Sequence, residues 1–142
     1  MRKFAFATLF LVTSPLAAAE LPGPVEARVV RVVDGDTFEA DALVWPGHMV
    51  RVKVRIRGID APELRARCAS EKQAALAAQE TLTGLLLGEG IQVRNVGADK
   101  YFGRVVADVE TGDGSDVATR LLAMNVARPY DGGKRVPSCP SG

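Results

Sequence analysis

Acidic and basic side chains concentrate in three short segments of the sequence, each beside a run of residues with strand character. Residues 34–37 read Asp-Gly-Asp-Thr, residues 58–63 read Gly-Ile-Asp-Ala-Pro-Glu, and residues 100–104 read Lys-Tyr-Phe-Gly-Arg. Taken alone, each has an ordinary interpretation: a tight turn, a loop that leaves a strand with solvated acids, and a hairpin loop with a buried Phe102. Taken together, they could supply the side chains of a phosphate-directed site.

The carboxylates of the first two segments are of the type that holds a hard cation. Asp36 is not needed for the Asp-Gly turn before it, and together with Asp60 it could bind Ca²⁺, which takes carboxylate and carbonyl oxygens. Glu63 follows a proline and could accept a proton from water as a general base. Arg104 could hold a phosphate through two parallel hydrogen bonds, because its guanidinium is a planar fork.

The hydrophobic pattern predicts the elements that must position these segments. Residues 50–57 alternate strictly between apolar and basic side chains, which predicts a strand with one apolar and one basic face. For the basic face, a solvated surface and a track for phosphates are both open. Strands are also expected over residues 25–33, 38–42, 91–96 and 104–110, and helices over residues 70–87 and 115–125. Ser70 and Gln73 form a capping-box pattern for the first helix, and Ser115 is expected to cap the second.

Five short strands, with a helix after the third and a shorter second helix, predict a mainly β protein with helices (α+β). The expected architecture is a closed, five-stranded OB-fold β-barrel, and an open α+β sheet is the alternative. A length of 142 residues fits one domain, and a hydrophobic content of 47% excludes a disordered chain. We therefore expect a single domain over residues 20–142, in which residues 129–142 form an irregular C-terminal tail.

Residues 1–19 have the pattern of a cleaved secretory signal peptide. Arg2 and Lys3 precede an apolar run over residues 4–12 that only Thr8 interrupts, and three alanines precede Glu20. The run is much shorter than the ~20 residues of a spanning helix, although an N-terminal membrane anchor is the alternative. We expect an exported protein, periplasmic or secreted, without stable membrane association after cleavage.

Cys68 and Cys139 are the only cysteines in the sequence. An even number in an exported chain predicts one intrachain disulfide between them, with two free buried thiols as the alternative. A single histidine and the absence of a CxxC motif argue against a zinc site.

The three segments, in this order, resemble the staphylococcal nuclease (thermonuclease) family. The motifs are Asp-Gly-Asp-Thr, then Arg-x-x-Gly-Ile-Asp-Ala-Pro-Glu, then Asp-Lys-Tyr-x-Gly-Arg, and the resemblance runs from about Val25 to Tyr130. It implies an OB-fold nuclease that hydrolyses DNA and RNA phosphodiester bonds without sequence specificity. It also implies one Ca²⁺ per active site and 3′-phosphate products.

The resemblance further implies roles for individual residues. The implied metal ligands are Asp36, Asp60 and the backbone carbonyl of Ala61. The implied catalytic residues are Arg55 and Arg104, which bind the phosphate, and Glu63, the general base. The implied substrate contacts are Lys100 and Tyr101 at the terminal phosphate, to which we add Tyr130.

The sequence also departs from the family pattern. Phe102 is one inserted residue beside Arg104, the segment between Glu63 and the first helix is short, and no long helix follows Tyr130. We expect the Cys68–Cys139 disulfide to hold the tail in place of that helix.

The charge balance limits the kind of partner. The chain has 18 basic and 17 acidic residues, a formal net charge of +1, and loss of Arg2 and Lys3 with the signal peptide would make it −1. Near-neutrality predicts weak, brief binding of DNA or RNA through few phosphate contacts. We also expect a monomer that prefers single-stranded or unpaired substrate. A catalytically inactive OB-fold nucleic-acid-binding module is the rival interpretation, and a structural exported domain is a third. A binding module has no use for Asp36, Asp60 and Glu63 together.

Overall fold

The computed structural model describes residues 19–136 and Cys139, so the expected signal peptide lies outside the described residues except for Ala19. The elements follow one another as β1 (Val25–Asp34), β2 (Thr37–Trp45), β3 (His48–Ile56), β4 (Ile59–Asp60), α1 (Ala69–Leu86), β5 (Gly90–Ala98), β6 (Arg104–Thr111), α2 (Val117–Ala123) and β7 (Arg128–Pro129). Neither helix of this part of the chain is long and apolar enough to cross a membrane.

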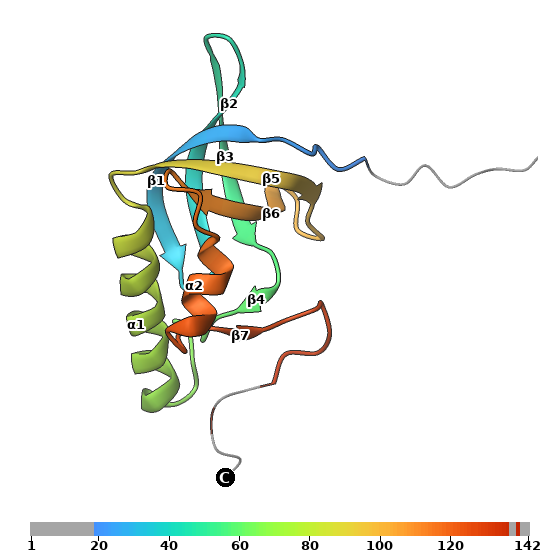
Figure 1. The fold of residues 1–142 in the computed structure, drawn as a ribbon. Coiled ribbons are helices and arrows are strands. Elements are labelled where there is room, and N and C mark those ends of the chain that lie inside the picture. The colour runs from blue at the N-terminus through green and yellow to red at the C-terminus, as the bar shows by residue number, and fades with distance from the viewer. Residues whose placement is uncertain (1–18, 137–138, 140–142) are drawn as a thin grey trace, which may run out of the picture.

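Five strands close into a barrel in the order β1-β2-β3-β6-β5, and pairing of β1 with β5 closes the ring. All pairs are antiparallel except β3 with β6, which are parallel. Figure 1 shows α1 beside the barrel and the β2–β3 hairpin extending beyond it. The prediction of a closed, mainly β barrel with two helices is confirmed, and the open sheet is not observed.

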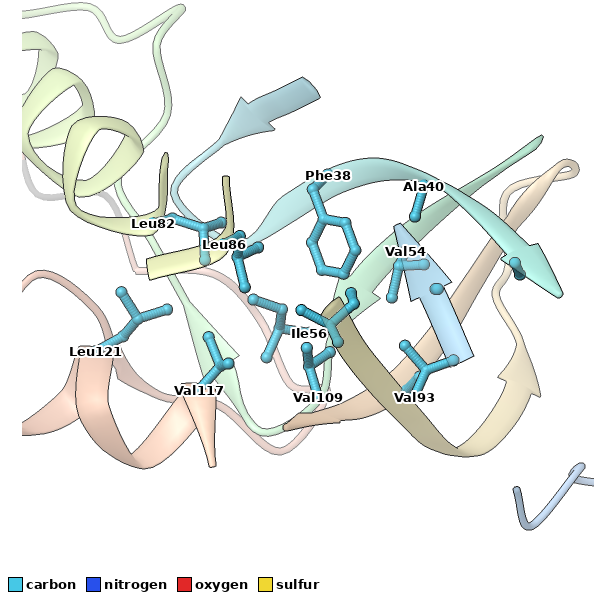
Figure 2. Close-up of a cluster of buried hydrophobic side chains, with 14 of the residues drawn as sticks. Phe38, Ala40, Val54, Ile56, Leu82, Leu86, Val93, Val109, Val117 and Leu121 are labelled. Carbon is cyan, nitrogen blue, oxygen red and sulfur yellow. The ribbon is translucent and has the colours of Figure 1, made fainter. Parts of the chain in front are cut away.

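Alternation along the strands fills the barrel with apolar side chains (Figure 2). Phe38 of β2, Val54 and Ile56 of β3, and Val109 of β6 are almost completely buried. Leu82 and Leu86 of α1 and Leu121 of α2 close the same cluster from the outside. Burial of one such side chain stabilises the fold by about 1.5–3 kcal/mol, so the barrel is a rigid support for the loops at its end.

A second, two-stranded sheet pairs β4 with β7 below the barrel (Figure 1). The sequence analysis did not predict either strand: residues 58–63 were expected to be a loop, and Pro129 was placed in the irregular tail. Each strand has only two residues, too few for a recognisable alternation. Residues 130–136 contain no helix or strand, as expected.

Both helices begin at a residue other than the one expected. The N-cap of α1 is Cys68 and makes no side-chain cap hydrogen bond, so the Ser70–Gln73 capping box is wrong. The N-cap of α2 is Asp116, whose carboxylate accepts a hydrogen bond from the Thr119 amide at 2.7 Å. Ser115 lies one residue before this N-cap, in the preceding turn, where its amide donates to Asp113 and its carbonyl accepts from the Thr111 amide.

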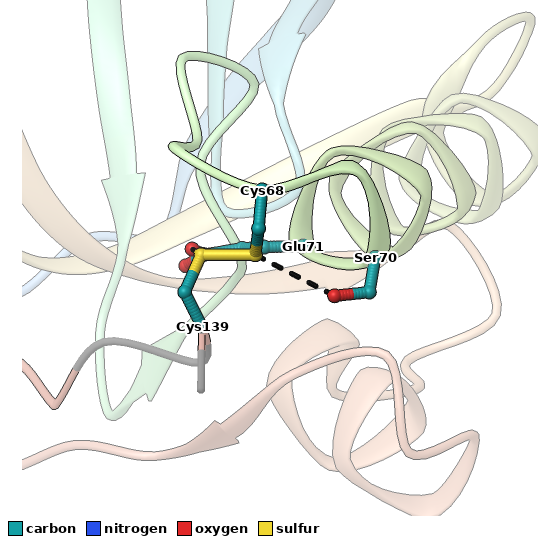
Figure 3. The surroundings of a disulfide bond; sticks show 4 residues. All are labelled: Cys68, Ser70, Glu71 and Cys139. Atoms are coloured by element: carbon teal, nitrogen blue, oxygen red, sulfur yellow. Dashed lines mark hydrogen bonds between the residues drawn. A yellow bond between two sulfur atoms is a disulfide. The ribbon is translucent and has the colours of Figure 1, made fainter. Parts of the chain in front are cut away.

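Cys68 and Cys139 form a disulfide, with their Cα atoms 5.9 Å apart (Figure 3). This confirms the predicted pairing. The bond joins the N-cap residue of α1 to the C-terminal tail. The tail is therefore fastened at the helix that follows the Asp60–Glu63 segment.

Gly35 is required by close packing at the β1–β2 turn. A Cβ atom at this position would lie 2.5 Å from the Cβ of Ala78 on α1 and 2.7 Å from the Cβ of Ala61. Both distances are well inside van der Waals contact. The Asp-Gly dipeptide is thus more than a turn signal, because the absence of a side chain lets α1 and residue 61 approach the turn that carries Asp36.

We predict that Gly35→Ala lowers the free energy of unfolding by about 1–3 kcal/mol, because the added methyl overpacks this contact. Gly84→Ala is the matched control: Gly84 lies in α1 with open space around it, so the same change should stabilise by about 0.5–1 kcal/mol. Urea unfolding followed by circular dichroism measures both. Equal effects in the two variants would contradict the packing role of Gly35.

Candidate active site

The register of the barrel places the two predicted metal ligands beside a predicted phosphate ligand. Thr37 on β2 pairs with Arg55 on β3, and the Ile56 amide donates to the Asp36 carbonyl at 2.9 Å. Asp60 follows four residues after Ile56, in β4. Asp36, Arg55 and Asp60 therefore meet where β2 begins and β3 ends.

Both carboxylate oxygens of Asp36 accept a hydrogen bond. One oxygen accepts from Thr37 Oγ1 at 2.9 Å, and the other accepts from the Ala61 amide at 2.8 Å. The Asp36 amide in turn donates to Asp34 Oδ1 at 3.2 Å. Burial raises the pKa of Asp36 to about 6, since the opposing charge of Arg55 offsets only part of the desolvation and the charge of Asp34 adds to the rise.

Arg55 bridges the two buried aspartates. Its Nη1 lies 3.3 Å from Asp36 Oδ2 and its Nη2 lies 3.5 Å from Asp60 Oδ1. Nη1 also donates to the backbone carbonyls of Ile56 at 3.2 Å and Ile59 at 2.9 Å. These contacts fix the guanidinium at the end of β3.

Two arginines that the sequence analysis did not select complete the charge pairing of Asp60. Arg128 pairs with Asp60 across the β4–β7 sheet and donates to Oδ2 through Nε at 3.2 Å and Nη2 at 2.9 Å. Arg135, in the tail, contacts Oδ1 through Nε at 2.7 Å and Nη2 at 2.6 Å. The same Arg135 guanidinium forms an ion pair with Glu63 through Nη1.

Glu63 lies on the segment between β4 and α1, and 56% of its side chain is exposed. It faces the same cleft as Asp36 and Arg55. An exposed carboxylate beside two buried ones has access to water, as a general base requires. The ligand oxygens of Asp36, Asp60 and Glu63 do not all lie within 4.8 Å of one another, so these three described acids do not form a three-carboxylate cage.

The β5–β6 loop forms the opposite wall. Arg104 begins β6 and is paired in register with Lys53 on β3. Its Nε forms an ion pair with Asp99, and its guanidinium lies 4.7 Å from the centre of the Tyr101 ring. Burial acts to raise the pKa of Asp99, but the hydrogen bond and charge of Arg104 hold that pKa below its usual value. Asp99 is thus a positioning partner of Arg104.

The inserted Phe102 does not displace this wall. Its side chain is fully exposed at the tip of the loop, contrary to the buried Phe102 of the hairpin interpretation. Gly103 takes up the turn with a φ of +80°, and the Arg104 amide donates to the Tyr101 carbonyl at 3.2 Å. The extra residue is accommodated outward, and Arg104 still faces the cleft.

Tyr130 lies between the barrel and the tail. Its amide donates to the Gly58 carbonyl at 2.9 Å, and its hydroxyl donates to the Gly133 carbonyl at 2.8 Å. Arg55 lies over its ring, 5.9 Å from the centroid. The tyrosine therefore packs against the predicted phosphate ligand at the point where the tail begins.

One cleft of about 1120 Å³ gathers the predicted residues. It is lined by Asp36, Arg55, Glu63, Lys100, Tyr101, Arg104 and Tyr130. Asp60 and Ala61 are not among its lining residues and lie buried behind its wall. Arg51 and Lys53, in contrast, pair with Asp41 and Glu39 of β2, which favours the solvated interpretation of that basic face.

The carboxylates of Asp36 and Asp60 fit a hard divalent cation. Arg135 Nη2 lies 2.6 Å from Asp60 Oδ1 and 3.8 Å from Asp36 Oδ2, so both carboxylates already contact the same guanidinium nitrogen. Both carboxylates are at least 96% buried, and a buried carboxylate must be paired with a cation or neutralised. Oxygen donors around a common point are what Ca²⁺ prefers.

A closed OB-type barrel whose end carries buried carboxylates, an exposed carboxylate and two inward-facing arginines defines a protein built to act on a phosphate group. Comparison with known proteins gives the family. Residues 53–137, more than half of the chain, match the family model described as staphylococcal nuclease homologue, and the chain belongs to this family. It is also 29% identical over 131 residues to proteins named uncharacterized endonuclease from Escherichia coli and from Escherichia coli O157:H7. These matches cover 92% of this chain and 75% of each relative, and with the family they support a nuclease.

We predict that Asp99→Asn lowers nuclease kcat/KM by about tenfold to a hundredfold, because a neutral amide no longer holds the Arg104 guanidinium in place. Steady-state digestion of single-stranded DNA measures the effect. Asp41→Asn is the control, since it breaks an Arg–Asp pair with Arg51 outside the cleft. A rate in Asp99→Asn equal to that of the control would remove Asp99 from the site.

Proposed function

We propose that the protein is an exported, Ca²⁺-dependent nuclease that hydrolyses phosphodiester bonds of DNA and RNA without sequence specificity and leaves 3′-phosphates. The observation that carries the proposal is the single cleft in which the Asp36 carboxylate, exposed Glu63 and the guanidinium groups of Arg55 and Arg104 converge. A catalytically inactive OB-fold binding module would use the arginines to bind phosphates but would have no use for the acids.

The arginines would bind the scissile phosphate from two walls of the cleft. Arg55 comes from the end of β3 and Arg104 from the start of β6, and β3 and β6 are adjacent parallel strands. A phosphodiester gains negative charge as water adds to phosphorus. Fixed donors aimed at its oxygens therefore stabilise the transition state more than the substrate.

Glu63 would remove the proton from the attacking water. The new bond joins the water oxygen to phosphorus, and the bond from phosphorus to the 5′-oxygen breaks. The 5′-oxygen leaves with a proton from solvent as a hydroxyl, so the phosphate stays on the 3′ side. Asp36, Asp60 and the carbonyl of Ala61 would hold Ca²⁺, which supplies positive charge to the phosphate when bound.

Further aspects of the proposal rest on the sequence and on the cleft rim. The pattern of residues 1–19 supports export, periplasmic or secreted. Tyr101 is 57% exposed beside Lys100, so it offers an aromatic face to an unstacked base next to a cation. This supports a preference for single-stranded or unpaired substrate, bound by a monomer.

We predict that Glu63→Gln lowers kcat by about 10² or more while the protein folds normally, because an amide cannot accept the proton. Single-stranded DNA is digested with Ca²⁺ or with a chelator, and Glu80→Gln, an exposed glutamate on α1, is the control. Chelator should abolish cutting by the unmodified protein. Cutting that persists in chelator, or wild-type cutting by Glu63→Gln, would refute the mechanism. Products that polynucleotide kinase labels directly, and that a polymerase extends only after phosphatase treatment, would verify the 3′-phosphate.

Arg55→Lys should lower kcat by about 10²–10³, because lysine keeps the charge but lacks the planar fork. Lys53→Arg on the same strand is the control, since Lys53 pairs with Glu39 away from the cleft. Single-turnover digestion separates the chemical step from product release. A single-turnover rate that Arg55→Lys leaves unaltered would exclude Arg55 from the reacting centre.

A further inference from the structure

The acid cluster is balanced in charge by arginines of this chain. Its three carboxylates belong to Asp36, Asp60 and Glu63, and the guanidinium groups in contact with them in the described structure belong to Arg55, Arg128 and Arg135. Within these ion pairs, formal charges of −3 and +3 cancel, and Asp34 adds one more acid beside Asp36. A divalent cation between Asp36 and Asp60 would be repelled by the guanidinium groups and would compete with them for the carboxylate oxygens.

Arg135 is the guanidinium that touches all three carboxylates. It contacts Asp60 through Nε at 2.7 Å and Nη2 at 2.6 Å, approaches Asp36 Oδ2 at 3.8 Å, and pairs with Glu63 through Nη1. It therefore takes the place between the proposed metal ligands and the proposed base at the same time.

The backbone decides which arginine can leave. Arg55 is only 11% exposed on a barrel strand and donates to two carbonyls, and Arg128 belongs to β7, whose register with β4 fixes it against Asp60. Arg135 lies in residues 131–136, which form no helix or strand and are held by side chains: the Tyr130 hydroxyl donates to the Gly133 carbonyl, and Arg128 donates to the Val136 carbonyl. Removal of Arg135 from the cluster therefore breaks side-chain contacts only.

The tail segment that carries Arg135 is fastened at both ends. The Tyr130 amide is bonded to Gly58 at one end, and at the other Cys139 is joined by the disulfide to Cys68, at the start of α1 (Figure 3). A short tether keeps the guanidinium at a high effective concentration near the acids, and so strengthens its competition with a free cation.

We propose that Arg135 is a tethered internal cation that competes with the divalent metal for Asp36 and Asp60 and pairs with Glu63 while it does so. The inference rests on the proposed function, because it takes these acids as the metal site. Exit of Arg135 opens the metal site and frees the Glu63 carboxylate from its ion pair in one movement. The Cys68–Cys139 disulfide sets the strength of this competition.

Calcium titration of the purified, oxidised protein tests the proposal without recourse to activity. Isothermal titration calorimetry measures the Kd for Ca²⁺ after removal of metal with a chelator. Arg135→Gln should lower that Kd by about tenfold, the size expected when one charge-assisted hydrogen-bonded contact no longer competes. Lys134→Gln removes the same charge one residue away, where no ion pair is formed with a described residue, and should change the Kd by less than about twofold.

A second pair of variants tests the tether. Replacement of both Cys68 and Cys139 by serine should lower the Kd for Ca²⁺ when Arg135 is present, because the guanidinium then competes at lower effective concentration. The same double replacement should leave the Kd unchanged in the Arg135→Gln background. Thermal unfolding in chelator verifies folding and should show a lower Tm for Arg135→Gln, since Asp60 then lacks one of its cations.

The outcomes separate this inference from the proposed function. If the unmodified protein binds Ca²⁺ and Arg135→Gln binds it with the same Kd, Arg135 does not compete with the metal. The same conclusion follows if Lys134→Gln lowers the Kd as much as Arg135→Gln does. Either result would overturn the proposed competition and leave the calcium site in place. No binding by either Arg135→Gln or the unmodified protein up to about 10 mM Ca²⁺, well above the range of extracellular calcium modules, would refute both. A tenfold lower Kd for Ca²⁺ in Arg135→Gln, without such a change in Lys134→Gln, would establish the competition.

Discussion

The whole site depends on the burial of two carboxylates that cannot be left uncompensated. Asp36 and Asp60 are 3% and 1% exposed, and an isolated charge in such a place is costly enough that it must be neutralised or paired. The chain meets this demand with guanidinium groups from a barrel strand, a two-residue strand and the tail. The routes by which these guanidinium groups reach the two acids largely determine the geometry of the cleft.

The barrel contributes position, and the loops contribute chemistry. Register between β2 and β3 sets Asp36 beside Arg55, and the parallel pairing of β3 with β6 sets Arg104 across the cleft. Gly35 lets residue 61 approach the turn closely enough for the Ala61 amide to reach Asp36. Rigid strands therefore hold the side chains that would contact a phosphate, whereas Glu63 and Arg135 lie on segments without regular structure.

Short-range patterns in the sequence were sufficient for the barrel and for one half of the site. Alternation in residues 50–57 predicted β3, and three local motifs located the acids and Arg55 and Arg104, because in each case the informative residues are neighbours in the chain. Arg128, Arg135 and Asp99 were missed, since their importance arises from contacts with residues distant in sequence or from a side-chain pair within a loop. One signal was available: Cys68 lies five residues after Glu63 and Cys139 four after Arg135, so the expected disulfide already brought Arg135 near the acids.

The pairing of β4 with β7 also has a consequence for when the site comes into being. Asp60 is separated from Arg128 by 68 positions and from Arg135 by 75, so ribosomal synthesis delivers the acids long before two of their cations. A nascent chain that has completed β1 to β4 holds Asp36 and Asp60 with Arg55 alone. The full constellation of charges can assemble only after the last strand and the tail have emerged, which makes the acid cluster one of the latest parts of the molecule to reach its final form.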